Sequence, residues 1–147
     1  MTARRAEVLG DLEREVGVMV RRIRRVIADR ARSVHVDLAP SSYLMLTYVA
    51  ENGPMRASEI AEQFDIDKGA ISRQVTHLTE LGLLARVTDP DDGRAMLVSV
   101  SDEGHARLTD VAQHRRKWLD ERLGDWADED LTGFVAALGR YNRALDA

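Results

Sequence analysis

A chain of 147 residues, 44% hydrophobic and 31% charged, has the composition and length of one globular domain. The absence of cysteine excludes disulfides, thiolate metal ligands and thiol-based redox sensing. The net charge of −4 argues against a protein that binds polyanions through its overall charge, although acidic residues concentrate towards the C-terminus. No apolar run approaches the roughly 18 residues of a membrane span, and the N-terminus lacks the apolar core of a signal peptide. We therefore expect a cytoplasmic protein.

The first predicted helix covers residues 6–34. Its apolar positions recur at helical spacing: Leu12, Val16, Met19, Ile23, Val26 or Ile27, Ala31 and Val34. A helix this long usually needs a partner helix to cover such a stripe. Its polar side carries six arginines between positions 21 and 32, which either contact phosphates or form a solvated face whose stems cover apolar surface.

Two shorter helices follow. Pro40 suits the first turn of a helix that we expect to end near Glu51, before Asn52-Gly53-Pro54. Its predicted buried positions are Tyr43, Leu44, Leu46, Thr47, Tyr48 and Val49. A third helix is predicted from Ser58 to Phe64, followed by a turn at Asp65-Ile66.

The fourth predicted helix, residues 67–81, carries the main functional signal. Asp67 is a good N-cap and Gly82 suits the position that closes the helix. Ile71, Val75 and Leu78 form one apolar row, which indicates a buried face. The opposite side holds Ser72, Arg73, Thr76 and His77 with the small residues Gly69 and Ala70, and Gln74 lies on the flank. Such donors read base edges, and a short helix, a tight turn and a helix of this kind predict a DNA-binding helix-turn-helix.

A β-hairpin and two more helices complete the chain. Residues 83–88 and 95–100 are rich in β-formers, and Asp89-Pro-Asp-Asp-Gly-Arg94 between them is typical of a turn. Ser101 is the expected cap of a helix to about Leu123, and the last helix covers roughly 128–145. The predicted fold is mainly α with a small β-wing, in the order α-α-α-α-β-β-α-α.

These motifs together resemble one family. They are Gly53-Pro54, Ser58–Ala61, Lys68–Val75, Leu78–Leu84, Asp89–Arg94 and Leu97–Ser101 with Gly104, and they resemble the MarR-type (multiple antibiotic resistance) transcriptional regulators. The resemblance implies a single domain, 1–147, in which a winged helix-turn-helix lobe (40–100) joins intertwined dimerisation helices (6–34 and 105–145). It also implies a homodimer on a pseudo-palindromic operator of double-stranded DNA. Two-fold symmetry then predicts recognition helices about 34–36 Å apart.

The resemblance further implies a repressor that a small aromatic or phenolic ligand releases from DNA, with no cofactor or metal. By family position, the ligand pocket would be lined by Val34, His35, Tyr43, Leu46, Tyr48 and Trp118. Apolar walls with a few polar groups suit such a pocket, although residues such as Tyr43, Tyr48 and Trp118 more often belong to the core.

Five residues of the fourth helix have predicted roles at DNA. We expect Arg73 to contact a guanine and Gln74 to contact a neighbouring base or phosphate. Lys68 and Ser72, with the amide end of the helix, would hold phosphates. His77 would reach DNA late in the helix. The alternatives are a solubilising arginine at position 73, a hydroxyl bonded back to its own helix at 72, and simple solvent exposure at 77.

The hairpin is the predicted wing. Arg94 would enter the minor groove and Asp92 would hold it by an ion pair; the alternative is a plain turn with a weak surface pair. Two positions depart from the family pattern. Gly93 stands where many relatives have a second arginine, and Arg56 stands where a Thr or Ser usually caps the third helix, so that helix is expected to rely on Ser58 or to begin late.

Other protein classes fit the sequence less well. It has no Gly-x-Ser-x-Gly, no phosphate-binding glycine loop and no His-Glu-x-x-His, which argues against an enzyme. The four histidines are scattered along the chain, which argues against a metal sensor. The remaining alternative is a winged-helix module that binds another protein and has weak or no affinity for DNA.

Overall fold

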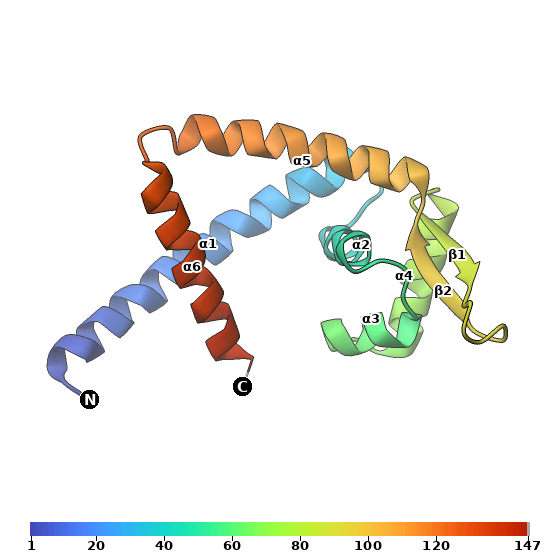
Figure 1. The fold of residues 1–147 in the computed structure, drawn as a ribbon, viewed down its shortest axis with the longest axis horizontal. Helices are drawn as coiled ribbons and strands as arrows, with labels where there is room; N and C mark the ends of the chain where they lie inside the picture. The colour runs from blue at the N-terminus through green and yellow to red at the C-terminus, as the bar shows by residue number, and fades with distance from the viewer. Residues whose placement is uncertain (147) are drawn as a thin grey trace. The chain divides into compact units, whose positions relative to one another are not determined.

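A computed structural model describes residues 1–146, which form six helices and one two-stranded sheet (Figure 1). In chain order they are α1 (Ala3–Val34), α2 (Pro40–Asn52), α3 (Ala57–Phe64), α4 (Lys68–Glu80), β1 (Leu84–Thr88), β2 (Met96–Val100), α5 (Asp102–Arg122) and α6 (Asp128–Leu145). The predicted fold class and element order are confirmed. The chain divides into two compact units, Met1–Val111 and Ala112–Ala147, and the boundary falls within α5.

Local chemistry explains where the first helices begin and end. Thr2 is the N-cap of α1, because its hydroxyl accepts a hydrogen bond from the Arg5 amide (3.2 Å), so the helix begins three residues before the predicted start. Pro40 opens α2 after an extended Ala39. Gly53 follows α2 with φ +74°, a conformation that side-chain-bearing residues rarely adopt.

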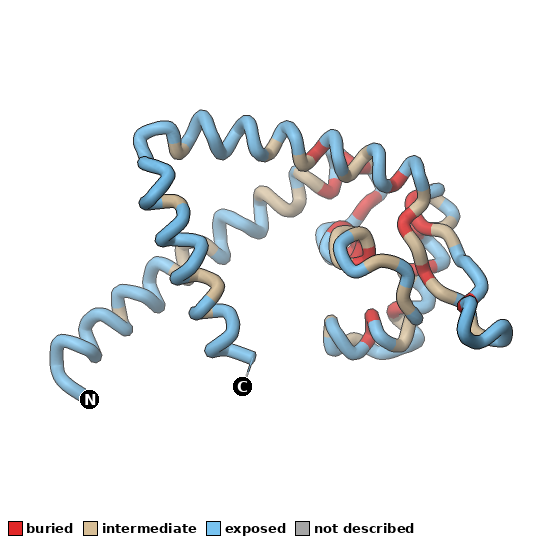
Figure 2. The backbone as a smooth tube through the Cα atoms, in the orientation of Figure 1, coloured by how far each residue is buried: buried red, intermediate tan, exposed pale blue. Residues whose placement is uncertain are grey.

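The core of the first unit lies among α2, α3, α4 and the sheet, where Figure 2 shows most of the buried positions. Leu46, Ile60, Leu78 and Leu83 are fully buried. Three of the six predicted α2 positions, Tyr43, Leu46 and Val49, are buried. Thr47 and Tyr48 are only half-buried. Leu44 is wrong, because it is 41% exposed and Met45 takes the buried place. The buried residues of α2 are Ser42, Tyr43, Met45, Leu46 and Val49, which follow a helical repeat that passes over Leu44.

The sheet is an antiparallel hairpin that a third segment extends. Leu84 pairs with Val100 at one end and Thr88 with Met96 at the other. Met55, in the segment before α3, forms a β-bridge with Val98, with N–H···O distances of 3.0 and 2.7 Å in the two directions. The segment just before α3 is therefore hydrogen-bonded to β2, which lies between this segment and β1.

A close backbone joint connects the start of α5 to the end of α4. The Ser101 hydroxyl donates to the Gly82 carbonyl (2.6 Å) and accepts from the Gly104 amide (3.0 Å), which confirms Ser101 as the cap of α5. Gly104 is buried, and a Cβ added there would lie 2.4 Å from the Leu83 carbonyl oxygen. Only glycine allows this approach of helix to chain.

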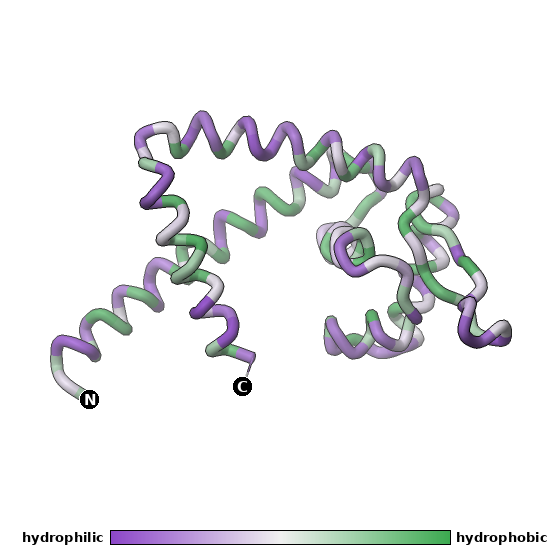
Figure 3. The backbone as a smooth tube through the Cα atoms, viewed as in Figure 1, coloured by the Kyte–Doolittle hydropathy of each residue, from purple (hydrophilic) through white to green (hydrophobic). Residues whose placement is uncertain are grey.

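In the second unit, α6 has the predicted bounds and no buried residue. Trp126 and Phe134 meet edge to face, with ring centroids 5.9 Å apart. Phe134, Val135 and Leu145 remain 51%, 68% and 64% exposed. Figure 3 shows hydrophobic positions recurring along α6 and α1, the pattern of a helix with one apolar face.

Candidate nucleic-acid interface

Helix α4 is fixed at both ends by the residues predicted to do so. The Asp67 carboxylate accepts from the Ala70 amide (3.2 Å) as the N-cap. At the other end Gly82 has φ +77°, and the Leu83 amide donates to the Leu78 carbonyl (3.0 Å). This is a Schellman ending, in which a left-handed glycine lets the chain turn back and satisfies the last helical carbonyls.

The two faces of α4 divide as the sequence predicts. Ile71, Val75 and Leu78 are at most 2% exposed and pack into the core. On the opposite side, the exposed residues are Lys68, Gly69, Ser72, Arg73, Thr76 and His77, while Ala70 and Gln74 are partly buried. We call these eight residues the recognition face. It places donor side chains and small residues on an open surface, as base and phosphate contacts require.

The turn before α4 uses a left-handed residue. Asp65 ends α3 with φ +49° and ψ +47°, a conformation that aspartate tolerates better than most residues. The next amide, on Ile66, donates to the Ala61 carbonyl (3.0 Å). A short helix, this tight turn and the exposed α4 together complete a helix-turn-helix.

The wing, β1 and β2 with the loop 89–95, has a tip closed by aspartates. The Asp89 carboxylate accepts from the Asp91 amide (2.9 Å), and the Asp89 amide donates to the Ala95 carbonyl (3.0 Å). The Asp92 carboxylate accepts from the Arg94 backbone amide (3.1 Å). Both carboxylates form turns in which an Asx side chain bonds the backbone two residues on.

The predicted ion pair between Asp92 and Arg94 is wrong. Within residues 1–146, the only cation within ion-pair distance of the Asp92 carboxylate is Arg56, at 4.0 Å. Asp92 shapes the turn through the backbone of Arg94 instead, because a side chain two residues away is better placed to reach an amide than a long guanidinium. Arg94 itself is exposed at the wing tip.

Arg56 also differs from its expected role. It is the N-cap residue of α3, which begins at Ala57, so the helix neither begins late nor relies on Ser58. The Arg56 backbone amide donates to the Glu59 carboxylate (3.0 Å), which is half of a capping box. Its side chain points elsewhere, and the guanidinium donates to the Asp89 carboxylate (3.1 Å).

Asp89 is the buried acidic group of the wing, with 8% of its surface exposed. The hydrogen bond from the Asp91 amide lowers the pKa of Asp89 below its ordinary value of 3.8, and the Arg56 guanidinium lowers it further. The same contact raises the pKa of Arg56. The charged pair is therefore the stable form of this contact at neutral pH.

This shift predicts an acid-dependent loss of stability. Because folding lowers the pKa of Asp89, its carboxylate stabilises the fold above about pH 4, and the contribution disappears as the pH falls through the folded pKa. Urea unfolding of the wild type and Asp89→Asn should differ most at neutral pH and converge as the pH falls from 5 towards 2. Asp91→Asn, which removes a neighbouring exposed carboxylate, is the control. If the difference in the free energy of unfolding between wild type and Asp89→Asn grew as the pH fell, the proposed stabilisation by the Asp89 carboxylate would be wrong.

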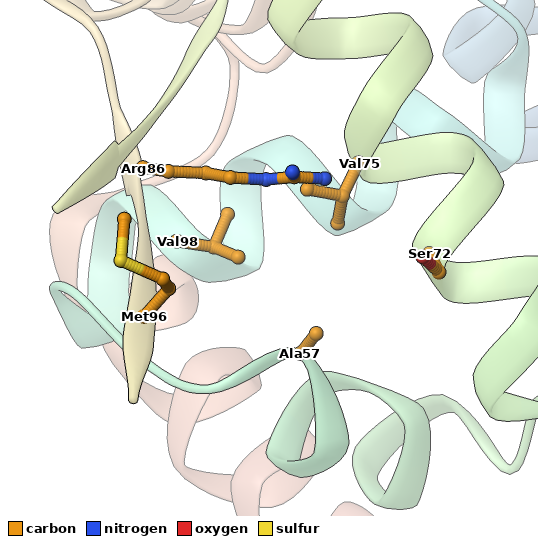
Figure 4. Close-up of a pocket in the computed structure, with 6 residues that line it drawn as sticks. All are labelled: Ala57, Ser72, Val75, Arg86, Met96 and Val98. Carbon is orange, nitrogen blue, oxygen red and sulfur yellow. The ribbon is translucent and has the colours of Figure 1, made fainter. Parts of the chain in front are cut away.

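A groove of about 270 Å³ lies between the wing and α4 (Figure 4). Its lining residues are Ala57, Ser72, Val75, Arg86, Met96 and Val98. Arg86 extends from β1 towards α4, where its guanidinium donates to the Thr76 hydroxyl (3.2 Å). Two cations near the wing, Arg86 in this groove and Arg56 beside Asp89, received no site role from the sequence alone. Arg86 lies within a β-strand and Arg56 at the start of a helix. Their sequence neighbours do not indicate a site, because the contacts of both residues depend on how the strands and helices pack.

The residues predicted for a ligand pocket have different surroundings. Val34, Tyr43 and Leu46 are at most 5% exposed and belong to the core, which is the alternative that the sequence left open for Tyr43. Tyr48 packs edge to face against Phe64, with ring centroids 5.5 Å apart. The Nδ1 atom of His35 accepts a hydrogen bond from the Asp37 amide (3.0 Å). Trp118 belongs to the second unit, and the Arg122 guanidinium lies 5.2 Å from the centroid of its ring.

Comparisons with known proteins decide the family. Residues 36–95, which include α2 to β1 and the wing loop, match the model of the MarR family. The chain is 33% identical over 134 residues to the uncharacterized HTH-type transcriptional regulator YxaD of Bacillus subtilis, an alignment that covers 91% of this chain and 92% of the relative. The chain belongs to the MarR family.

Further relatives agree with this assignment. A MarR-family protein of Bacillus stearothermophilus has the same fold, with a TM-score of 0.78 at 19% identity over 100% of this chain and 99% of that one. The HTH-type transcriptional repressor MdtR of Bacillus subtilis is 24% identical over 64% of this chain and 61% of its own. MarR-family proteins are transcriptional regulators rather than enzymes, so the predicted class is confirmed. None of the helices within residues 1–146 combines the length and hydropathy that a bilayer crossing requires.

Proposed function

We propose that this MarR-family regulator binds a pseudo-palindromic operator as a homodimer and represses transcription. The observation that carries the proposal is the recognition face, which is open to solvent while the opposite side of α4 is fully packed. Arg94 at the wing tip adds a further cation to Lys68 and Arg73 of the recognition face. In this arrangement α4 would read base edges in the major groove, and the wing would respond to the shape of the minor groove.

Removing Arg73 tests the proposal directly. A duplex is first enriched from a random-sequence pool by repeated binding to the wild-type protein, and we call it the selected duplex. Arg73→Ala should weaken binding to the selected duplex by about 1–3 kcal/mol and relax the base preference at one position in each half-site. Fluorescence anisotropy titrations of the selected duplex and its single-base variants measure both effects.

Arg73→Lys is the matched control, because it keeps the charge and loses the planar fork that pairs with a guanine. Arg73→Lys should retain the wild-type affinity for random duplex and lose the preference for one base at the position that Arg73 contacts. Equal affinity of wild type and Arg73→Ala for the selected duplex would show that this face does not read bases. If no duplex is enriched and random duplex gives no salt-dependent binding, the protein-binding module is the better interpretation.

The homodimer is supported by the uncovered apolar surface of the terminal helices. In α6 Phe134, Val135 and Leu145 are more than half exposed, and in α1 Leu12 and Ile23 are 40% and 42% exposed. An amphipathic helix gains most of its stability from packing its apolar face, so a second copy would bury what one chain leaves open. Proteins of this family act as dimers.

Repression and its relief complete the proposal. The relative MdtR is a transcriptional repressor. In the present chain, occupancy of an operator by two lobes would block transcription. A small aromatic ligand would release DNA only if it binds the DNA-bound and free forms with different affinity. Displacement of the selected duplex by a panel of phenols and aromatic carboxylates, followed by anisotropy, tests this. A panel without effect on affinity would contradict it.

A further inference from the structure

The loop of the wing is held by a contact from outside the hairpin. The Arg56 guanidinium lies 3.1 Å from one oxygen of Asp89 and 4.0 Å from one oxygen of Asp92. Asp89 is the first residue of the loop, and its side chain is only 10% exposed, whereas the Arg56 side chain is 46% exposed. The carboxylate is therefore enclosed, and the guanidinium covers it from the solvent side. The bridge between Met55 and Val98 brings the residue before Arg56 against β2. The backbone and the side chain of one segment therefore secure the hairpin at neighbouring points.

Charge gives this contact a second consequence. The loop 89–95 carries three carboxylates, on Asp89, Asp91 and Asp92, against the single cation of Arg94. A loop with that balance is repelled by phosphates unless its carboxylates are neutralised. Arg56 faces two of the three, while the Asp89 and Asp92 carboxylates also bind backbone amides within the loop. The remaining carboxylate, Asp91, is exposed.

We propose that Arg56 is a positioning residue for the wing. By holding Asp89 and facing Asp92, it fixes the angle at which Arg94 reaches the minor groove and neutralises the loop, without itself binding a phosphate. The inference rests on the proposed binding to DNA. Because the Arg56 charge is taken up by carboxylates of the protein, it releases no counterion from DNA.

Four variants test the proposal: Arg56→Ala, Asp89→Asn, the double variant Arg56→Ala/Asp89→Asn, and Arg94→Ala. Each is titrated against the selected duplex at several salt concentrations. Arg56→Ala and Asp89→Asn should each weaken binding about tenfold, and the double variant should be no weaker than either. The slope of log affinity against log salt should stay at the wild-type value for the first three and fall by about 1 for Arg94→Ala.

The sign of the Asp89→Asn effect discriminates between models. If Arg56 contacts a phosphate directly, Asp89→Asn frees its guanidinium and removes a negative charge near DNA, so binding should tighten, and Arg56→Ala should lower the salt slope. That result would overturn the proposal. So would unchanged binding by Arg56→Ala when Arg73→Ala and Arg94→Ala both weaken it. If neither of those two variants changed affinity, the proposed DNA-binding function would be wrong, and this inference would fall with it.

Hydrogen exchange supplies a readout that does not use DNA. The Asp89 and Ala95 amides, which donate within the loop, should exchange faster in Arg56→Ala and recover in Arg56→Lys, which can still pair with one carboxylate. Unchanged exchange would contradict a positioning role. Thermal melting of each variant separates a loosened wing from an unfolded protein.

Discussion

Substitution Val135→Glu is expected to convert the dimer to monomers and to weaken binding to the selected duplex by about 100- to 10,000-fold. Val135 is 68% exposed in the single chain and lies on the apolar side of α6. Burying an unpaired carboxylate in a dimer interface is strongly unfavourable. A monomer then binds one half-site alone and loses the gain of about 10²–10⁴ that linkage of two sites provides.

Ala136→Glu is the matched control. Ala136 is exposed on the opposite side of α6 from Leu131 and Leu138, so the same new charge should stay in solvent and leave the dimer intact. Analytical ultracentrifugation gives the mass of each variant, and anisotropy gives its affinity. A monomeric Val135→Glu that binds as tightly as wild type would contradict the proposed two-site binding.

Gly104→Ala is expected to destabilise the protein by about 3 kcal/mol, near the upper end of the range for overpacked sites. The added methyl group would lie 2.4 Å from the Leu83 carbonyl oxygen and 2.8 Å from a Val100 methyl group. Backbone cannot retreat as a flexible side chain can, so the start of α5 must shift away from the end of α4. Urea unfolding monitored by tryptophan fluorescence and circular dichroism measures the loss.

Gly133→Ala provides the comparison, since this α6 glycine is exposed and nothing lies within 4 Å of an added Cβ. There the same methyl group should stabilise the protein by up to about 1 kcal/mol, because alanine favours helix over glycine. If both substitutions destabilised the protein by a similar amount, close packing at Gly104 would not explain the effect of Gly104→Ala.

Residues that act on their own neighbours were predictable from the sequence. Asp67 and Gly82 bound α4 because capping and a left-handed turn need only a few adjacent residues. The apolar row through Ile71, Val75 and Leu78 fixed which side of that helix is buried, and therefore which side is open to DNA. The bounds of α6 followed in the same way from local pattern.

Contacts between distant segments were not predictable. The pair of Arg56 and Asp89 joins residues 33 positions apart, and no periodicity within either segment indicates it. The expected pair of Asp92 with Arg94 was wrong because sequence proximity does not show whether a carboxylate meets a guanidinium or a backbone amide. The misplaced Leu44 shows a smaller error of the same origin, since its exposure depends on which neighbours pack around α2.

One hydroxyl, that of Ser101, hydrogen-bonds both the Gly82 carbonyl and the Gly104 amide, so the end of α4 and the first turn of α5 are joined directly. We expect the lobe to reorient by a bend farther along α5, whose 21 residues span about 30 Å. A swing of about 10° over that lever would carry the lobe sideways by about 5 Å, nearly half the width of a major groove of about 12 Å. Distances between spin labels on the two copies of α4 would reveal such a swing. If the protein binds its operator as proposed, a bend of this size would be enough to separate the recognition face from the groove.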